Sequence, residues 1–131
     1  MEKSLSGPRL HHVATKMEKW FAELVNQHQL PIWFSGLNEY WVKGRNPDFK
    51  VHERKLVIEI TDGYTYRKQA RNHENYSKPT IAHYEANGHA CLVVMMPERR
   101  HKWTEPLQAS LLATVHTFLA TGKSAIWDFN E

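Results

Sequence analysis

The chain has 131 residues, 41% of them hydrophobic and 24% charged, a balance typical of a single globular domain. Its 17 Lys and Arg residues against 14 Asp and Glu give a formal net charge of +3, a modest excess that favours a polyanionic partner. A single cysteine excludes an internal disulfide, and no apolar run approaches the roughly 18 residues of a membrane helix. We therefore expect a cytoplasmic protein that makes no contact with a membrane.

The first part of the chain predicts one helix followed by strands. Residues 1–10 contain Ser, Gly and Pro and are expected to form a flexible N-terminus. Residues 11–29 carry apolar side chains at helical spacing, which predicts an amphipathic helix that ends before Pro31. Residues 32–42 are rich in aromatic side chains and are expected to form one or two strands.

Two further strands, residues 46–52 and 55–61, follow each other so closely that they predict a hairpin. With the turn centred between them, Asp48 lies directly opposite Glu59, and side chains at opposed antiparallel positions share a face. Thr61 joins that face because side chains repeat every second residue along a strand. A turn with an odd number of residues would instead place Glu59 on the face away from Asp48.

The next segment predicts helices followed by a buried strand. Residues 65–77 are polar and compatible with a helix, which we expect to break at Pro79. A second short helix is expected from Pro79 to Asn87, before a glycine suited to a helix C-terminus. Residues 89–96 are apolar, and we expect them to pair parallel to a hairpin strand because a crossover helix precedes them.

The final helix is predicted between Thr104, a good N-cap residue, and Gly122, a good C-terminal glycine. Residues 123–131 are expected to form a loosely docked tail. The predicted order is therefore helix, strand, strand, strand, helix, strand, helix. This order indicates an α/β fold with one mixed sheet, in a single domain that spans residues 1–131.

Glu59 interrupts the apolar run of its strand, where an unpaired charge would cost several kcal/mol of folding free energy. Asp48 is expected on the same face, so some positive charge should compensate the two carboxylates. Carboxylate oxygens are the ligands that hard divalent cations prefer in proteins. The pair therefore predicts a metal site at the hairpin.

The element order, together with Pro47-Asp48 and Glu59-Ile60-Thr61, resembles the PD-(D/E)XK nuclease superfamily, whose core is restriction-endonuclease-like. The resemblance covers the layout from the first helix to the apolar strand, but at residue level only these short motifs carry it. It implies a Mg²⁺-dependent DNA endonuclease, with Mn²⁺ able to substitute for Mg²⁺. Asp48, Glu59 and the main-chain carbonyl of Ile60 would hold the metal.

The third motif position departs from the family, because Thr61 stands where a lysine is usual. The resemblance implies a replacement from elsewhere, and Lys68 in the following helix is the first candidate, with Arg67 second. Alternatively, the site resembles the mismatch-nicking branch of the superfamily, and Asp62 is then an additional ligand. A third possibility is that activity is lost and the domain is a non-catalytic nucleic-acid-binding or assembly module.

Other residues of the site are also suggested. Many superfamily members add a glutamate from the first helix, which here would be Glu23 or Glu18, with Glu39 as a third candidate. Basic residues flank the two carboxylates along the chain and predict phosphate contacts. They are Lys43, Arg45, Arg67, Arg71, Arg99 and Arg100.

The substrate class follows from what the chain lacks. A small domain with no visible segment for reading a long sequence favours structure-directed cutting, such as the resolution of Holliday junctions or nicking. Cutting two strands together would need a homodimer. The final helix, or the region of Trp33 and Trp41, is the predicted interface.

Overall fold

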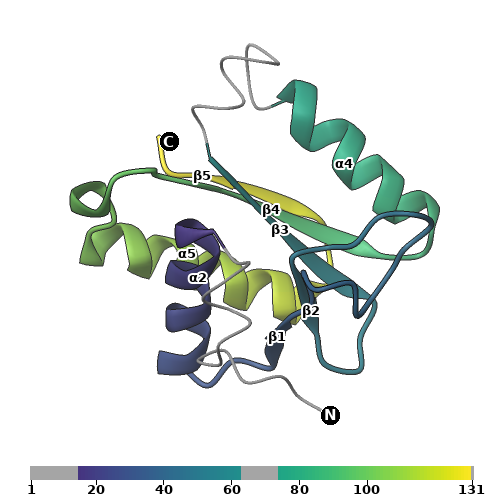
Figure 1. Cartoon of the computed structure of the whole chain (residues 1–131), viewed down its shortest axis with the longest axis horizontal. Coiled ribbons are helices and arrows are strands. Elements are labelled where there is room, and N and C mark those ends of the chain that lie inside the picture. Colours follow the sequence, from purple (N-terminus) through teal and green to yellow (C-terminus); the bar gives the residue numbers. More distant parts are fainter. Residues whose placement is uncertain (1–14, 63–73, 131) are drawn as a thin grey trace.

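The computed structural model describes residues 15–62 and 74–130. Figure 1 shows the arrangement of their helices and strands. These elements are α2 (Lys16–Gln27), β1 (Ile32–Phe34), β2 (Phe49–Val51), β3 (Leu56–Asp62), α4 (Glu74–Ala86), β4 (Ala90–Met96), the 3₁₀ helix η1 (Arg100–Lys102), α5 (Glu105–Thr121) and β5 (Ala125–Asp128). Within the two described segments, no helix combines the length and the apolar character needed to cross a membrane.

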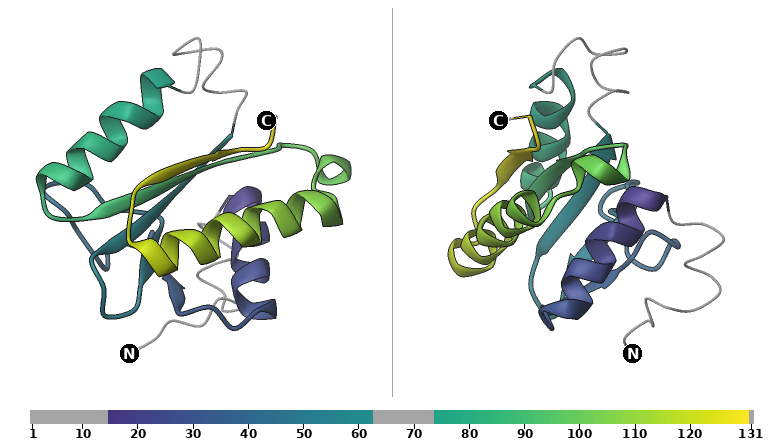
Figure 2. Two further views of the ribbon diagram at one scale, coloured as in Figure 1. Left: turned by 180° about the vertical axis from the view of Figure 1, so that it is seen from behind. Right: turned by 90° about the vertical axis from the view of Figure 1, so that its left-hand side faces the viewer.

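The strands form one five-stranded sheet in the order β1-β2-β3-β4-β5. Strands β1 and β2 pair antiparallel, as do β2 and β3, whereas β4 pairs parallel to β3 and β5 pairs parallel to β4. Helix α4 covers one face of the sheet, and α2 and α5 cover the other (Figures 1 and 2). The predicted α/β class with a mixed sheet and a parallel β4 is confirmed. The predicted element order was wrong at its end, because it lacked β5.

The helices begin and end where their capping residues indicate. Thr15 and Glu18 form a capping box at the start of α2, each side chain accepting a hydrogen bond from the other residue's main-chain N–H. Thr104 caps α5, and Gly122 ends it with a φ of 67°, a conformation that favours glycine. The apolar side of α2 packs on the sheet, where the rings of Phe21 and Phe49 meet edge-on with centroids 4.9 Å apart.

The hairpin of β2 and β3 has the predicted register. Phe49 pairs with Ile58 and Lys50 with Val57, so the same register continued by one residue places Asp48 opposite Glu59. The connecting turn contains Glu53 with a φ of 58°.

The strands before the hairpin are shorter than the sequence predicts. Strand β1 covers only Ile32–Phe34, and residues 35–48 form a loop.

The predicted helix break at Pro79 is wrong. The described part of α4 runs from Glu74 to Ala86 with Pro79 inside it, so no second helix begins there. A proline within a helix removes one main-chain hydrogen bond. Packing offsets this loss, because Tyr84 is fully buried and Tyr76 and Ile81 pack against the same apolar cluster on the sheet.

The prediction of a loosely docked C-terminal tail is wrong. Residues 125–128 form β5, and Trp127 within it is only 6% exposed. Its Nε1 donates a hydrogen bond to Ser110 Oγ of α5 at 3.1 Å. The short strand was missed because it lies at the edge of the sheet and has only four residues, too few for a clear alternation of apolar and polar side chains.

The buried position of Trp127 gives a prediction about stability. Replacing Trp127 with alanine is expected to lower the free energy of unfolding by about 3–5 kcal/mol, the usual cost of truncating a buried tryptophan. Urea unfolding followed by circular dichroism would measure the change. The matched control is Trp41→Ala, since Trp41 is 53% exposed and its loss should leave stability almost unchanged. Equal, small effects of the two substitutions would contradict the docking of β5.

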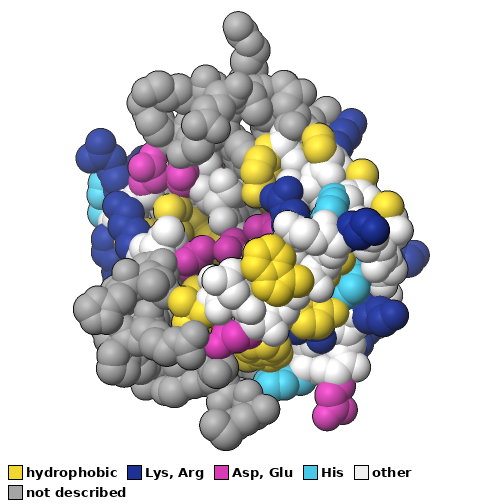
Figure 3. Space-filling model, turned by 45° about the vertical axis from the view of Figure 1, so that its right-hand side comes forward, with side chains coloured by type: hydrophobic (Ala, Val, Ile, Leu, Met, Phe, Trp, Pro, Cys, Tyr) yellow, Lys and Arg dark blue, Asp and Glu magenta, His cyan; other side chains and the backbone are white. Residues whose placement is uncertain are grey.

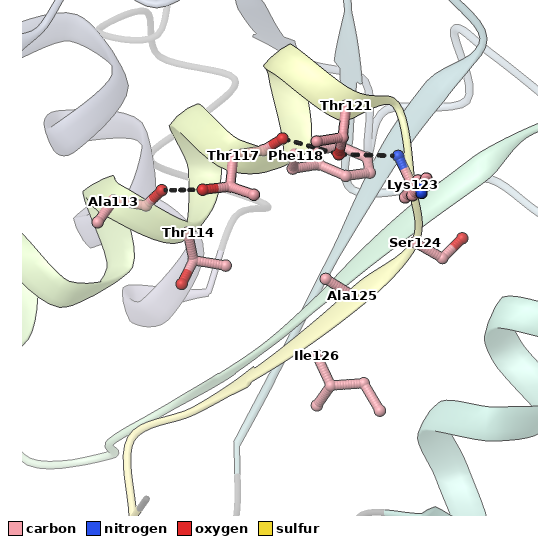
Figure 4. Close-up of a pocket in the computed structure, with 9 residues that line it drawn as sticks. All are labelled: Ala113, Thr114, Thr117, Phe118, Thr121, Lys123, Ser124, Ala125 and Ile126. Atoms are coloured by element: carbon pink, nitrogen blue, oxygen red, sulfur yellow. Dashed lines mark hydrogen bonds between the residues drawn. The ribbon is translucent and has the colours of Figure 1, made fainter.

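A groove of about 480 Å³ lies between α5 and β5 (Figure 4). The hydroxyl groups of Thr117 and Thr121 donate to main-chain carbonyls of the helix itself, and Ser124 Oγ accepts from the main-chain N–H of Cys91. These polar groups are therefore already bonded within the chain. A ligand site with directed polar contacts is better supported at the hairpin.

Candidate metal centre

Asp48 lies just before β2, where hydrogen bonds from Ile60 and Ser35 fix its position. Its Oδ2 accepts a hydrogen bond from the main-chain N–H of Ile60 at 2.8 Å. Its main-chain carbonyl accepts from the N–H of Ser35 at 2.8 Å, and Ser35 Oγ donates to the carbonyl of Pro47 at 2.8 Å. The carboxyl group is therefore held against the central strand β3.

The Asp48 carboxyl group has a pKa well above its ordinary value. Burial is the main cause, and the negative charges of Glu59 and Glu18 add to it, against a smaller opposing effect of the Ile60 N–H. The register of β2 and β3 places Asp48 opposite Glu59, and their like charges repel each other. A cation placed between the carboxylates would relieve this repulsion.

Glu59 is 5% exposed and has partners within the chain. Its Oε2 accepts a hydrogen bond from the hydroxyl of Tyr84 on α4, and Arg45 Nε lies 3.2 Å from the same oxygen. The positive charge expected near Glu59 is therefore supplied in part by Arg45. Since both contacts fall on Oε2, a cation would be bound through Oε1.

Arg45 is held between the hairpin and α4. Its Nη2 donates to Tyr76 at 3.1 Å and to Thr80 at 3.4 Å, and its guanidinium lies 5.8 Å from the centre of the Tyr84 ring. Burial and the charge of Glu59 raise the pKa of Tyr76 to about 12, so its hydroxyl remains a donor or acceptor at neutral pH. The sequence predicted Arg45 as a phosphate contact. Its ion pair with Glu59 was missed because Arg45 lies in a loop with no periodic pattern.

The hydrogen bond from Tyr84 gives a second prediction. Tyr84→Phe is expected to lower the free energy of unfolding by about 1–3 kcal/mol, because Glu59 remains buried with one donor fewer. Chemical denaturation of the parent and the variant would measure it. A matched control is Tyr84→Phe combined with Glu59→Gln: the two changes together should cost less than the sum of their separate effects. Strict additivity would show that the hydroxyl does not support Glu59.

Glu18 is the glutamate of α2 whose charge raises the pKa of the Asp48 carboxyl group. Glu23, by contrast, is exposed on α2. The sequence prediction named Glu23 as the catalytic glutamate, with Glu18 as its alternative, because both flank the apolar stripe. The capping-box pattern of Thr15 and Glu18 is the signal that marks which glutamate lies at the start of the helix. Glu39, the third candidate, lies in the loop between β1 and β2.

Thr61 follows Glu59 by two residues in β3 and therefore projects to the same side of the strand. Its Oγ1 lies 3.4 Å from the main-chain carbonyl of Asp62. The proposed replacements for the motif lysine, Lys68 and Arg67, lie outside the described residues, as does Arg71.

The remaining predicted phosphate contacts are on the surface. Lys43 is exposed, and so are Arg99 and Arg100, which follow the C-terminal end of β4. Because β3 and β4 are parallel, this end lies beside the C-terminal end of β3. On the face drawn in Figure 3, acidic side chains form a central row with Lys and Arg side chains on both sides.

The donors at this site fit a magnesium ion better than a zinc ion. Among residues 15–62 and 74–130, no group of three or more His, Cys, Asp and Glu side chains is placed to hold a metal ion. Mg²⁺ needs only one or two protein carboxylates, since it retains several waters. Asp48 and Glu59, with the Ile60 carbonyl, match this requirement.

No protein-family model, curated protein or solved structure matches the chain.

Proposed function

We propose that the protein is a divalent-metal-dependent DNA endonuclease. The observation that carries the proposal is geometric: the register of β2 and β3 places Asp48, held by the Ile60 N–H, opposite the buried Glu59. Two carboxylates brought together on a central strand indicate a site selected for something other than stability. The direction of the Asp48 pKa, raised by burial and by the charges of Glu59 and Glu18, and the Pro47-Asp48 motif agree with this interpretation.

Each residue has a role in this proposal. Asp48, Glu59 and the main-chain carbonyl of Ile60 hold the cation, which when bound acidifies a water and neutralises charge on the phosphate. The Ile60 N–H and Tyr84 orient the two carboxylates. Arg45 brings a fixed positive charge beside the site, which the usual lysine would otherwise supply.

The exposed cations Arg99 and Arg100 after β4, and Lys43 in the loop before β2, support DNA as the substrate. Phosphate contacts by such residues supply most of the sequence-independent affinity for DNA. Within this proposal the substrate is a structured DNA, such as a junction or a nicked site. A homodimer would allow both strands of a duplex to be cut.

A second candidate function has a specific observation in its favour. Arg45 and Tyr84 already satisfy one oxygen of Glu59 without any metal. A domain that had lost catalysis would keep such an arrangement as a structural ion pair. The alternative is therefore a nucleic-acid-binding or assembly module with no nuclease activity.

The experiment that separates the two functions uses supercoiled plasmid, single-stranded DNA and a four-way junction. Each is incubated with the protein in Mg²⁺, in Mn²⁺ or in chelator. We expect metal-dependent cleavage that Asp48→Ala and Glu59→Ala abolish and that Glu23→Gln leaves unchanged. Salt-sensitive binding without cleavage in any metal, unaffected by the alanine substitutions, would support the binding module and refute the nuclease.

A further inference from the structure

Trp41 is the exposed large hydrophobic side chain among the described residues, with 53% of its surface accessible. It lies in the loop between β1 and β2, four residues before Arg45. Single exposed hydrophobic side chains are common on protein surfaces, so the case for a binding role depends on how the loop that carries Arg45 holds Trp41.

A miniature hairpin holds this part of the loop. Val42 and Arg45 exchange two main-chain hydrogen bonds, of 2.8 and 3.1 Å. Between them, Lys43 and Gly44 have φ values of 47° and 82°, as a tight turn with two left-handed residues requires. Val42 is buried below the turn, and its carbonyl lies 2.9 Å from His83 Nε2 of α4.

The Asn46 side chain fixes the base of the same loop. Its Nδ2 donates to the carbonyls of Ser35 and Tyr40 at 2.7 and 2.8 Å, and its Oδ1 accepts from the N–H of Asn38 at 3.2 Å. The carbonyl of Asn38 in turn accepts a hydrogen bond from Trp41 Nε1 at 3.2 Å. The polar edge of the indole is thus satisfied within the chain, and the ring is held in one orientation at the surface.

We propose that Trp41 is a preorganised stacking platform for an unpaired nucleobase, so that the protein prefers DNA with single-stranded or branched character. The inference deepens the proposed function, on which it rests for DNA as the substrate. A base stacks on an aromatic ring regardless of its sequence, while nearby cations hold the backbone. Lys43 at the tip of the turn is exposed and supplies such a charge. Little conformational entropy is lost on binding because the loop is already fixed.

The test is equilibrium binding in Ca²⁺ or chelator, so that no cleavage occurs. The probes are a single-stranded oligonucleotide, a four-way junction and a blunt duplex. We expect Trp41→Ala to weaken binding of the first two by roughly 5- to 150-fold, which is the contribution of one stacked base, and to change duplex binding by less than about 3-fold. Trp41→Phe should retain most of the affinity. Lys43→Ala should weaken binding of all three probes. It should also reduce the salt dependence of the binding constant by about the amount expected for one phosphate contact.

Three results would overturn the proposal. In the first, Trp41→Ala binds single-stranded and branched DNA as the parent does. In the second, the parent binds none of the probes. In the third, sedimentation shows that Trp41→Ala converts a dimer into a monomer, which would make Trp41 an interface between two copies. Failure of the nuclease proposal would be a separate result. A protein that never cleaves DNA, but binds it in a way that depends on Trp41, would refute the nuclease activity and support the role of Trp41 as a stacking platform.

Discussion

Replacing Asp48 with asparagine is expected to abolish metal-dependent cleavage while stabilising the fold at neutral pH. Loss of a charged ligand should reduce kcat at least about 10³-fold, the upper range for removing one electrostatic stabiliser of the transition state. The asparagine oxygen can still accept from the Ile60 N–H, and the change removes the repulsion from Glu59 and Glu18. Activity and stability should therefore change in opposite directions.

The pH dependence of stability tests the cause of this effect. The folded pKa of Asp48 lies above its unfolded value of about 3.9, so the folded chain holds this proton more tightly than the unfolded chain. The resulting stability is fully present below the unfolded pKa and is lost as the pH rises through the folded pKa. The parent should thus lose stability relative to Asp48→Asn as the pH rises above about 4. Denaturation midpoints that stay equal for the two proteins at every pH would contradict the burial and repulsion at Asp48.

Glu59→Gln is expected to abolish cleavage to a similar extent but to destabilise the fold. Glu59 has favourable partners, because Arg45 and Tyr84 both contact its Oε2. Removing the charge weakens the ion pair with a half-exposed arginine and a charge-assisted hydrogen bond, which should cost about 1–3 kcal/mol. The loss of repulsion with Asp48 offsets part of this cost. Urea denaturation at pH 7 would measure the change.

Asp48→Asn and Glu59→Gln are compared in cleavage activity and in the free energy of unfolding. A nuclease site predicts loss of activity in both, with higher stability for Asp48→Asn and lower stability for Glu59→Gln. Glu23→Gln is the matched control for removing one carboxylate charge, since Glu23 is exposed on α2. It should leave both properties unchanged. If Glu59→Gln were as stable as the parent, Arg45 and Tyr84 would not be compensating its charge.

The hairpin shows what the sequence could predict. The short interval between two apolar strands determined their register, and the register brought Asp48 opposite Glu59. Capping residues likewise located both ends of α5. Such features depend on neighbours close in the sequence, so local patterns are sufficient to predict them.

The partners of Glu59 show what the sequence could not predict. Arg45 and Tyr84 meet Glu59 from a loop and from α4, which are 14 and 25 residues away in the sequence. These contacts depend on how α4 packs on the sheet, which no local pattern encodes. The same reason explains the error at Pro79, because tertiary packing maintains a helix that local propensity would break.

A calorimetric titration of Mn²⁺ into chelator-treated protein tests most directly whether Asp48 and Glu59 hold a divalent cation together. At pH 8, where Asp48 is more fully ionised than at pH 5, we predict saturable binding by the parent and by Glu23→Gln. Binding should be weaker at pH 5 and lost in Asp48→Asn. A parent that shows no saturable binding, or an Asp48→Asn variant that titrates as the parent does, would contradict the metal centre.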